Sequence, residues 1–298
     1  MMSNPPDYEA MAKALEATGD YRILRRLPKQ PAFAQFDGSE TRQAVVLDLE
    51  TTGLDPDTDE IIEIGMVPFT YALDGRLFAV GEAFSGLRQP SQPIPSEVAE
   101  LTGITDAMVM GHSIDPGDIE RRIEPAALII AHNAAFDRRF AERFCTAFTG
   151  KPWACSLSQI PWAEEGFEGA KLAYLLADCG YFFDGHRAVD DCMAVVELLS
   201  RPLPKSGRPA LGVLLEAARR KTYRIWAENS PFETKDILKA RGYRWNGDNN
   251  GKPRSWYFDA TEEIVESELA FLRSEILPPN ADIRVDYITA TDRFSERS

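Results

Sequence analysis

Two acidic residues, Asp48 and Glu50, lie two positions apart in the segment VVLDLETTGLD. The apolar residues before them predict a β-strand, on which both carboxylates emerge on the same face. Residues 51–53 then end the strand and leave the pair at its carboxyl end. Like charges at this spacing repel unless a cation lies between them, and the segment contains no Lys or Arg. A solvated strand face would also explain this pair taken alone.

The second candidate acid is Asp137, in the segment IIAHNAAFDRRF. The pattern predicts a helix over residues 134–148, on which Asp137 shares a face with Phe140, Ala141, Phe144 and Phe148. Arg138 and Arg139 point elsewhere on this helix. A carboxylate on an apolar face costs free energy unless it is paired or binds a metal.

The third acidic segment, HRAVDDCMAVVEL, contains two adjacent acids on a predicted helix. Asp190 shares a stripe with Ala194, Glu197 and Arg201, which is typical of a face in solvent. Asp191 aligns with Val195 and Leu198, toward the core. We therefore predict that Asp191 is functional and that Asp190 is surface charge.

Each of these acids could be structural by itself, but inward-facing acids from three separate segments indicate a shared ligand. Divalent cations would neutralise them, and carboxylate oxygens with water suit Mg²⁺ or Mn²⁺.

The three segments VVLDLETTGLD, AHNAAFD and HRAVDD together resemble the motifs of the DEDDh exonuclease family, which includes the proofreading subunits of bacterial replicative polymerases. The resemblance covers roughly residues 43–200. It implies a ribonuclease-H-like fold and two divalent metal ions held by Asp48, Glu50, Asp137 and Asp191. It also implies that His186, five positions before Asp191, is the general base, since an imidazole exchanges protons near neutral pH.

Two further positions narrow the resemblance. A sister class has Tyr where this chain has Arg187, and oligoribonucleases usually have Met where it has Thr52. The proofreading-like branch therefore fits better, and the segment IPSEVAELTGIT is similar to the family stretch beside the terminal nucleotide.

The resemblance implies hydrolysis of DNA from the 3′ end, releasing nucleoside 5′-monophosphates in proofreading, repair or end trimming. The two ions would clamp the attacking and leaving oxygens, with Glu50 and His186 as the catalytic residues. Leu54 and Phe136 could stack on terminal bases or pack in the core, and His132 could equally pack at a strand end. The candidate substrate contacts are Thr51, Thr52, Gly53, Leu54, His132, Asn133 and Phe136.

The surrounding pattern predicts an α/β fold, a ribonuclease-H-like mixed sheet flanked by helices. The expected strands are residues 43–50, 60–69, 78–87, 127–132 and 153–156. The expected helices lie near Ile119 and over residues 134–148, 171–180 and 188–200.

Three prolines within residues 201–209 indicate a linker. We predict an N-terminal extension (1–40) with a helix over 8–17, an exonuclease domain (41–202), a linker with a connecting helix (203–218), and a small α+β domain (219–298). The last reads βαββαβ, with a hairpin through NGDNNGKP, and is compatible with a ferredoxin-like sandwich.

Charge is unevenly distributed along the chain, which has a net charge of −14. Residues 219–298 contain 14 Lys+Arg and 14 Asp+Glu, whereas residues 1–218 contain 19 and 33. The C-terminal region also holds Trp226, Trp245 and Trp256 among basic residues, a combination that grips single strands by stacking and backbone attraction. The same aromatics could instead form the core of a small sheet. If they grip DNA, removing this region should spare the chemistry and weaken substrate binding.

Composition argues against other classes of protein. No apolar stretch approaches the ~20 residues that cross a bilayer, and no signal pattern opens the chain, so we expect a cytoplasmic protein with no membrane partner. The four cysteines form no CxxC pair, which argues against a disulfide framework or zinc site. The expected partners are single-stranded DNA 3′ ends, with RNA as an alternative, and a DNA polymerase. A non-catalytic DNA-end or polymerase-binding module is the rival interpretation, but the complete set of acids with His186 favours an enzyme.

Overall fold

The computed structural model describes residues 7–28, 33–247 and 251–297. Its centre is a six-stranded sheet in the order β4-β3-β2-β6-β7, with β5 also paired to β3. β2 and β3 are antiparallel, whereas β6 and β7 run parallel to β2, so the sheet is mixed as predicted. The strands are β2 (Thr41–Thr51), β3 (Ile61–Ala72), β4 (Leu77–Val80), β5 (Phe84–Leu87), β6 (Leu128–Ala131) and β7 (Trp153–Cys155).

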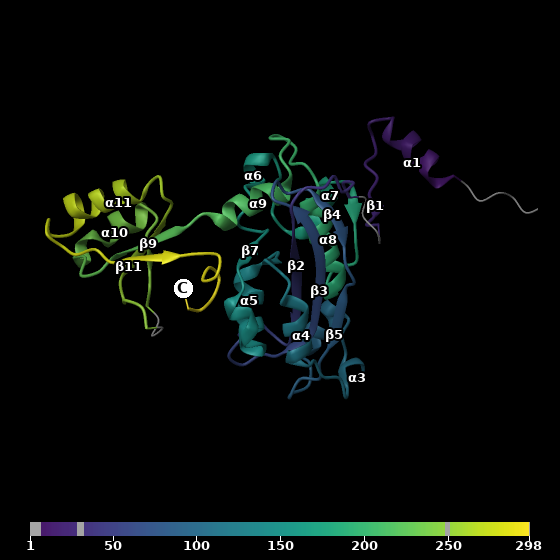
Figure 1. The fold of residues 1–298 in the computed structure, drawn as a ribbon, viewed down its shortest axis with the longest axis horizontal. Helices are drawn as coiled ribbons and strands as arrows, with labels where there is room; N and C mark the ends of the chain where they lie inside the picture. Colours follow the sequence, from purple (N-terminus) through teal and green to yellow (C-terminus); the bar gives the residue numbers. More distant parts are fainter. Residues whose placement is uncertain (1–6, 29–32, 248–250, 298) are drawn as a thin grey trace, which may run out of the picture.

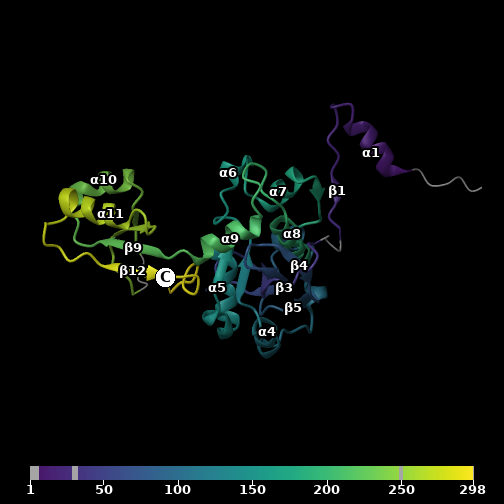
Figure 2. The same ribbon diagram turned by 45° about the horizontal axis from the view of Figure 1, so that its top comes forward.

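Helices cover both faces of this sheet (Figures 1 and 2). Ala44 and Val46 face the core formed with α7 (Leu172–Asp178), α8 (Ala188–Ser200) and α9 (Ala210–Arg219). Val45 and Leu47 face the opposite core, formed with α4 (Pro116–Ile123) and α5 (Ala134–Phe144). Asp48 and Glu50 continue the alternation of Ala44 and Val46, so they project on the α8 side.

Shorter elements complete the exonuclease domain and the N-terminal extension. In α1 no residue is buried, while β1 pairs in parallel with β8. No described helix is both long and apolar enough to cross a membrane. These elements are α1 (Tyr8–Glu16), β1 (Arg25–Arg26), α2 (Ser96–Thr102), α3 (Asp106–Val109), α6 (Trp162–Glu165) and β8 (Tyr181–Phe182).

Two predicted elements differ from the structure. The single strand expected over residues 78–87 is wrong: β4 and β5 are separate and pair with different parts of β3. The break lies opposite Pro68, whose carbonyl accepts from the N–H of Gly81 but whose ring nitrogen has no proton to donate. The helix expected over 134–148 ends at Phe144 and is followed by a 3₁₀ turn, Thr146–Gly150.

The C-terminal unit has the predicted βαββαβ order. Its four strands are antiparallel in the order β10-β11-β9-β12, which is the ferredoxin-like arrangement. Helices α10 and α11 cover one face and form its core. The predicted hairpin includes residues 248–250, which lie outside the described residues. The elements are β9 (Thr222–Ala227), α10 (Lys235–Ala240), β10 (Arg244–Trp245), β11 (Trp256–Ala260), α11 (Val265–Phe271) and β12 (Val285–Ile288).

The three tryptophans of this unit are not equivalent. Trp226 is 1% exposed and donates its indole N–H to Asp286, so it is unavailable for stacking on a base. Trp256 packs against the core under the helices, as the alternative explanation predicts. Trp245 alone of the three is largely in solvent, at 53% exposure.

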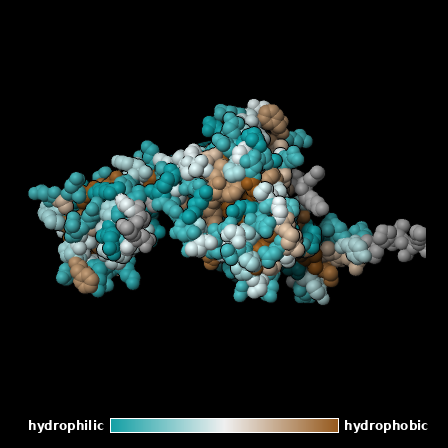
Figure 3. Space-filling model, turned by 90° about the horizontal axis from the view of Figure 1, so that it is seen from below, coloured by the Kyte–Doolittle hydropathy of each residue, from teal (hydrophilic) through white to brown (hydrophobic). Residues whose placement is uncertain are grey.

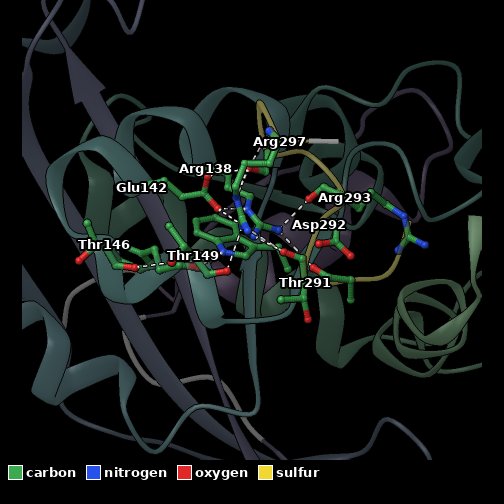
Figure 4. A network of polar contacts seen from close by, with 12 residues as sticks. Arg138, Glu142, Thr146, Thr149, Thr291, Asp292, Arg293 and Arg297 are labelled. Atoms are coloured by element: carbon green, nitrogen blue, oxygen red, sulfur yellow. Dashed lines mark hydrogen bonds and ion pairs between the residues drawn. The ribbon is translucent and has the colours of Figure 1, made fainter. Parts of the chain in front are cut away.

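The last described residues contact the exonuclease domain as well as the C-terminal unit, and Figure 4 shows their polar contacts with Arg138 and Glu142. Residues 289–297, here called the C-terminal segment, return to α5 and β7. The backbone N–H of Trp153 donates to the carbonyl of Ala290 at 2.8 Å, and the Phe294 side chain packs against the α5-side core. Removing residues 219–298 would therefore also remove these contacts of the exonuclease domain. That such a truncation spares the chemistry and weakens substrate binding stays a prediction.

Candidate active site

The structure brings three of the predicted acids together. One carboxylate oxygen from each of Asp48, Glu50 and Asp191 lies within 4.8 Å of the others. β2 supplies the first two, and the first turn of α8 supplies the third. Asp190 is exposed and Asp191 is partly buried, so the two acids differ in exposure as expected. The predicted solvent face for the Asp190 stripe is wrong, however, because Ala194 and Glu197 are buried, at 0% and 5% exposure.

A glycine allows α8 to approach the sheet closely enough for this. Gly65 on β3 is the register partner of Asp48 on β2. A methyl group on Gly65 would lie 2.4 Å from the carbonyl carbon of Ala188, at the start of α8, and 2.6 Å from its oxygen. These are backbone atoms, so an alanine at position 65 would push the helix, and Asp191 with it, away from the strands.

Asp137 lies beside this cluster but is not among its three closest members. It is 3% exposed, in the first turn of α5. Its negative charge still raises the pKa of Asp48, so the fourth predicted acid is an electrostatic neighbour of the other three.

The four carboxyl groups share an environment that opposes their ionisation. Burial raises the pKa of Glu50 to about 7, that of Asp137 to about 8 and that of Asp191 to about 6. Burial, followed by the charges of the other three acids, raises the pKa of Asp48 well above its ordinary value.

Among the described residues, no Lys or Arg forms an ion pair with any of the four carboxylates. The positive charge of Arg187 opposes the rise in the pKa of Glu50 without cancelling it, and the ion pair of Arg187 is with Glu63. Four acids can be ionised together here only if a cation joins them. An all-oxygen donor set fits a hard divalent cation, so the cluster is suited to a metal site.

His186 lies on the exposed loop that leads into α8, with a left-handed backbone (φ 66°). The loop is tied to the acidic cluster, because the backbone N–H of Arg187 donates to Asp191 at 3.2 Å. The Arg187 side chain donates in turn to Glu63 at 2.9 and 3.1 Å, and the N–H of Ala188 does so at 3.2 Å. Position 186 is thus fixed relative to the cluster by the residues that follow it.

Glu63 is the important residue that sequence reasoning missed. It is 1% exposed and lies opposite Glu50 in the ladder between β2 and β3. It is also the one charged residue in β3, so an acid within an otherwise apolar strand was the available signal.

The residues after Glu50 form a tight loop. The hydroxyl of Thr51 donates to the carbonyl of Gly53 at 2.5 Å, and that of Thr52 donates to Asp59 at 3.1 Å. A side chain on Gly53 would collide with the Asp59 carboxylate at 2.4 Å. Leu54 projects from this loop and is 83% exposed. Contact of these residues with a substrate stays a prediction.

The remaining predicted substrate contacts differ in their surroundings; they are His132, Asn133 and Phe136. Both ring nitrogens of His132 are used internally, Nδ1 with the Ser156 hydroxyl at 2.9 Å and Nε2 with the Ala170 carbonyl at 2.8 Å. A substrate contact for His132 is therefore not supported, and strand-end packing explains it. Asn133 is exposed at the start of α5, and Phe136 packs on Phe140 with ring centroids 5.0 Å apart.

Comparison with known proteins identifies the domain that contains this site. The model of the Exonuclease family (RNase T) matches residues 45–199, about half of the chain. This protein belongs to the exonuclease family. The matched range contains all four acids and His186, and family membership agrees with the mixed sheet flanked by helices.

The relatives of this exonuclease include proteins named as DNA polymerase III or as one of its subunits. A DNA polymerase III PolC-type from Thermotoga petrophila is 40% identical over 286 residues, covering 88% of this chain and 19% of that protein. The DNA polymerase III subunit epsilon of Aquifex aeolicus is 28% identical, covering 53% of this chain and 79% of that protein. A solved structure of Exonuclease X in complex with 5′ overhanging duplex DNA has a TM-score of 0.44 at 24% identity, covering 58% of this chain and 98% of that one. The chain thus spans about a fifth of the Thermotoga petrophila polymerase.

Proposed function

We propose that this protein is a metal-dependent 3′→5′ exonuclease that releases nucleoside 5′-monophosphates from DNA 3′ ends. The observation that carries the proposal is the clustering of Asp48, Glu50 and Asp191 within 4.8 Å, beside buried Asp137, with no basic ion-pair partner in the described part of the chain. Two divalent ions, Mg²⁺ or Mn²⁺, held there would acidify a water and stabilise charge on the attacking and leaving oxygens.

The chain's own residues have three roles in this proposal. Asp48, Glu50, Asp137 and Asp191 hold the ions, and His186 accepts the proton of the attacking water. The Glu63–Arg187 pair fixes the loop that carries His186, so Glu63 is a positioning residue. Thr51, Thr52, Gly53, Leu54, Asn133 and Phe136 are the proposed contacts of the terminal nucleotides.

Action alongside a DNA polymerase is supported by the names of the relatives, two of which are a replicative polymerase and an epsilon subunit. The chain covers only 19% of the former, so this association is part of the proposal rather than a property carried over.

The test compares 5′-labelled single-stranded DNA, duplex DNA, mismatched duplex and RNA of one sequence. We expect stepwise shortening from the 3′ end with Mg²⁺ or Mn²⁺, none in EDTA and none with Asp48→Ala. Preference for a mismatched 3′ end over a matched one would support proofreading. If RNA is cleaved faster than DNA, RNA is the substrate instead. Full activity in EDTA or in Asp48→Ala would overturn the proposal.

A further inference from the structure

A large cleft separates α5 of the exonuclease domain from the sheet of the C-terminal unit. Its volume is about 1020 Å³, at the upper end of the range of ligand sites. Figure 3 shows the two lobes from below, joined by a narrow neck and bordered by mainly hydrophilic residues. The charged groups that line it include Arg139 on α5, Arg224 and Arg244 on the sheet, and Arg293 on the C-terminal segment. We call this the arginine cleft.

Positive charge in the cleft is only partly compensated. Arg224 and Arg244 share one carboxylate, that of Asp259, at 2.7 and 2.5 Å, so the three groups carry a net positive charge. Both guanidinium groups also lie over the ring of Tyr257, with centroid distances of 4.6 and 4.9 Å. This arrangement orients the two guanidinium planes on one side of the sheet.

Arg293 adds a second uncompensated charge. Its guanidinium donates to the carbonyls of Ala218 and Arg220, at 3.3 and 2.6 Å, and to the Thr222 hydroxyl at 3.3 Å. All three acceptors are neutral, and no ion pair to Arg293 occurs within the described ranges.

The other charged groups of the cleft include two ion pairs. Arg139 pairs with Glu296, and Asp57 pairs with Arg143. The cleft is therefore positive overall, although the protein carries a net charge of −14. An anion is the ligand that this balance favours, and planar guanidinium groups match phosphate oxygens in geometry.

The position of the cleft indicates which anion it binds. Asp57 lies on the loop that follows Gly53, at the end of the strand that carries Glu50. Arg139 lies two residues after Asp137 on α5, on the side of the helix away from that carboxylate. Helix α5 thus carries Asp137 on one side and faces the cleft with another, and the lining of the cleft does not include the acidic cluster. The cleft therefore suits nucleotides on the 5′ side of the terminal position.

We propose that the arginine cleft binds the phosphate backbone of single-stranded nucleic acid upstream of the 3′-terminal nucleotide. The proposal rests on the exonuclease function proposed above and adds a second contact region to it. Short substrates would occupy the acidic cluster alone, and only longer strands would reach Arg244.

The test measures KM and kcat for a trinucleotide and for a 20-mer of one composition, with Arg244→Gln and Arg139→Gln. Each variant should raise KM for the 20-mer about 10-fold or more, as expected when one charged hydrogen bond is removed. The log–log slope of 20-mer binding against salt should become shallower by about 0.7 for each phosphate that the variant no longer binds. KM for the trinucleotide and kcat for both substrates should not change.

Arg241→Gln is the matched control, because Arg241 is in the same unit but pairs with Glu268 on the helix-covered side. It removes the same charge and should leave both substrates unaffected. Equal effects of Arg244→Gln on trinucleotide and 20-mer, or no effect on either, would overturn the proposal. If the cleft instead binds an acidic protein segment, Arg244→Gln should have no effect on either substrate.

Failure of the exonuclease function itself is distinguishable. If the wild-type protein cleaves neither oligonucleotide, anisotropy of a labelled 20-mer in EDTA still measures the cleft. Weaker binding by Arg244→Gln than by Arg241→Gln would then support the cleft, and equal binding would overturn it.

Discussion

Asp137 and Arg138 are neighbours on α5, and both are buried, at 3% and 0% exposure. Around Arg138 the chain supplies every partner: Glu142 at 2.7 Å and the carbonyls of Ala290, Thr291 and Arg293 at 3.2, 2.5 and 2.8 Å. Around Asp137, burial opposes ionisation most, and the charges of Glu50 and Asp191 add to it, while backbone hydrogen bonds offset only part of the effect.

The difference separates two uses of a buried charge. A charge whose partners all come from the same chain fixes those partners in place, so Arg138 is a structural joint between α5 and the C-terminal segment. A cluster of like charges that lacks a countercharge can be fully ionised only when a cation from solution joins it. Four changes test this contrast, from the largest expected effect to the smallest.

The largest effect should come from the acidic cluster itself. Asp191→Asn keeps the size of the side chain but removes one charge from the group that includes Asp48 and Glu50. We expect activity on single-stranded DNA to fall about 10³-fold or more, since metal-held charge in such sites contributes several kcal/mol. Asp190→Asn, one position away and exposed, should keep most activity in the same turnover assay. The reverse order of the two variants would contradict the assignment.

Arg138→Met should act on stability instead. It removes the buried cation beside the Glu142 carboxylate, which keeps its bonds to Arg297 and Ser295, and it removes the Arg138 donor from the carbonyls of the C-terminal segment. Breaking a buried pair costs up to about 3–5 kcal/mol, measurable as a lower urea midpoint at an unchanged slope. A midpoint within error of the wild type would show that the C-terminal segment does not stabilise α5.

Deleting residues 289–298 tests the same joint from its other side. The deletion uncovers Arg138 and removes the acceptor for the Trp153 backbone N–H, so it should destabilise the exonuclease domain. For this reason, loss of activity on removing the whole C-terminal region would not by itself show that the region binds DNA.

The third change is metal removal at different pH values. A carboxyl whose pKa is raised on folding binds its proton more tightly in the folded state. Without metal, stability from this site is therefore fully present below about pH 4, the unfolded value, and is lost as pH rises through about 6 to 8. A bound cation favours the ionised carboxylates instead of the protonated ones. Mg²⁺ or Mn²⁺ should therefore stabilise the folded protein more at pH 8 than at pH 5.

The measurement is the thermal midpoint with and without metal at both pH values. At a hundredfold excess over Kd, binding contributes about 2.7 kcal/mol. Asp48→Asn should abolish the metal-dependent shift and make the metal-free protein less sensitive to pH. Equal shifts at the two pH values would mean that the metal binds elsewhere.

Features that depend on residues close together in the sequence were predicted better than features that depend on residues far apart in it. Helix α8 was predicted over its observed range because its apolar periodicity is local. The same periodicity did not predict which faces of α8 are buried, because Ala194 and Glu197 on the Asp190 stripe also pack inside. The βαββαβ succession of the C-terminal unit was also predicted, and its β10-β11-β9-β12 order is that of the ferredoxin-like sandwich with which the pattern is compatible.

Features that depend on distant partners were not predictable in this way. Glu63 acquires its role only from strand register with Glu50 and from Arg187, 124 positions later. His132 is in a functional motif, yet its ring is held by Ser156 and Ala170, which nothing local indicates. The carbonyl partners of Arg138 are more than 150 positions away, so its position on the helix could not reveal them.

The smallest effect should come from the next residue on the same helix. Arg139 also meets the C-terminal segment, through Glu296 at 2.7 Å, but the two side chains are 43% and 46% exposed. Water and salt screen such a pair, so a double-mutant cycle of Arg139→Met and Glu296→Ala in urea unfolding should give a coupling of about 0.2–1 kcal/mol that declines as salt rises. Arg138→Met and Arg139→Met thus remove the same group one position apart, from a buried and an exposed site facing one segment. If the two substitutions lower the free energy of unfolding by similar amounts, the segment is held by many weak contacts together. A large loss for Arg138 alone would show that one buried guanidinium holds it.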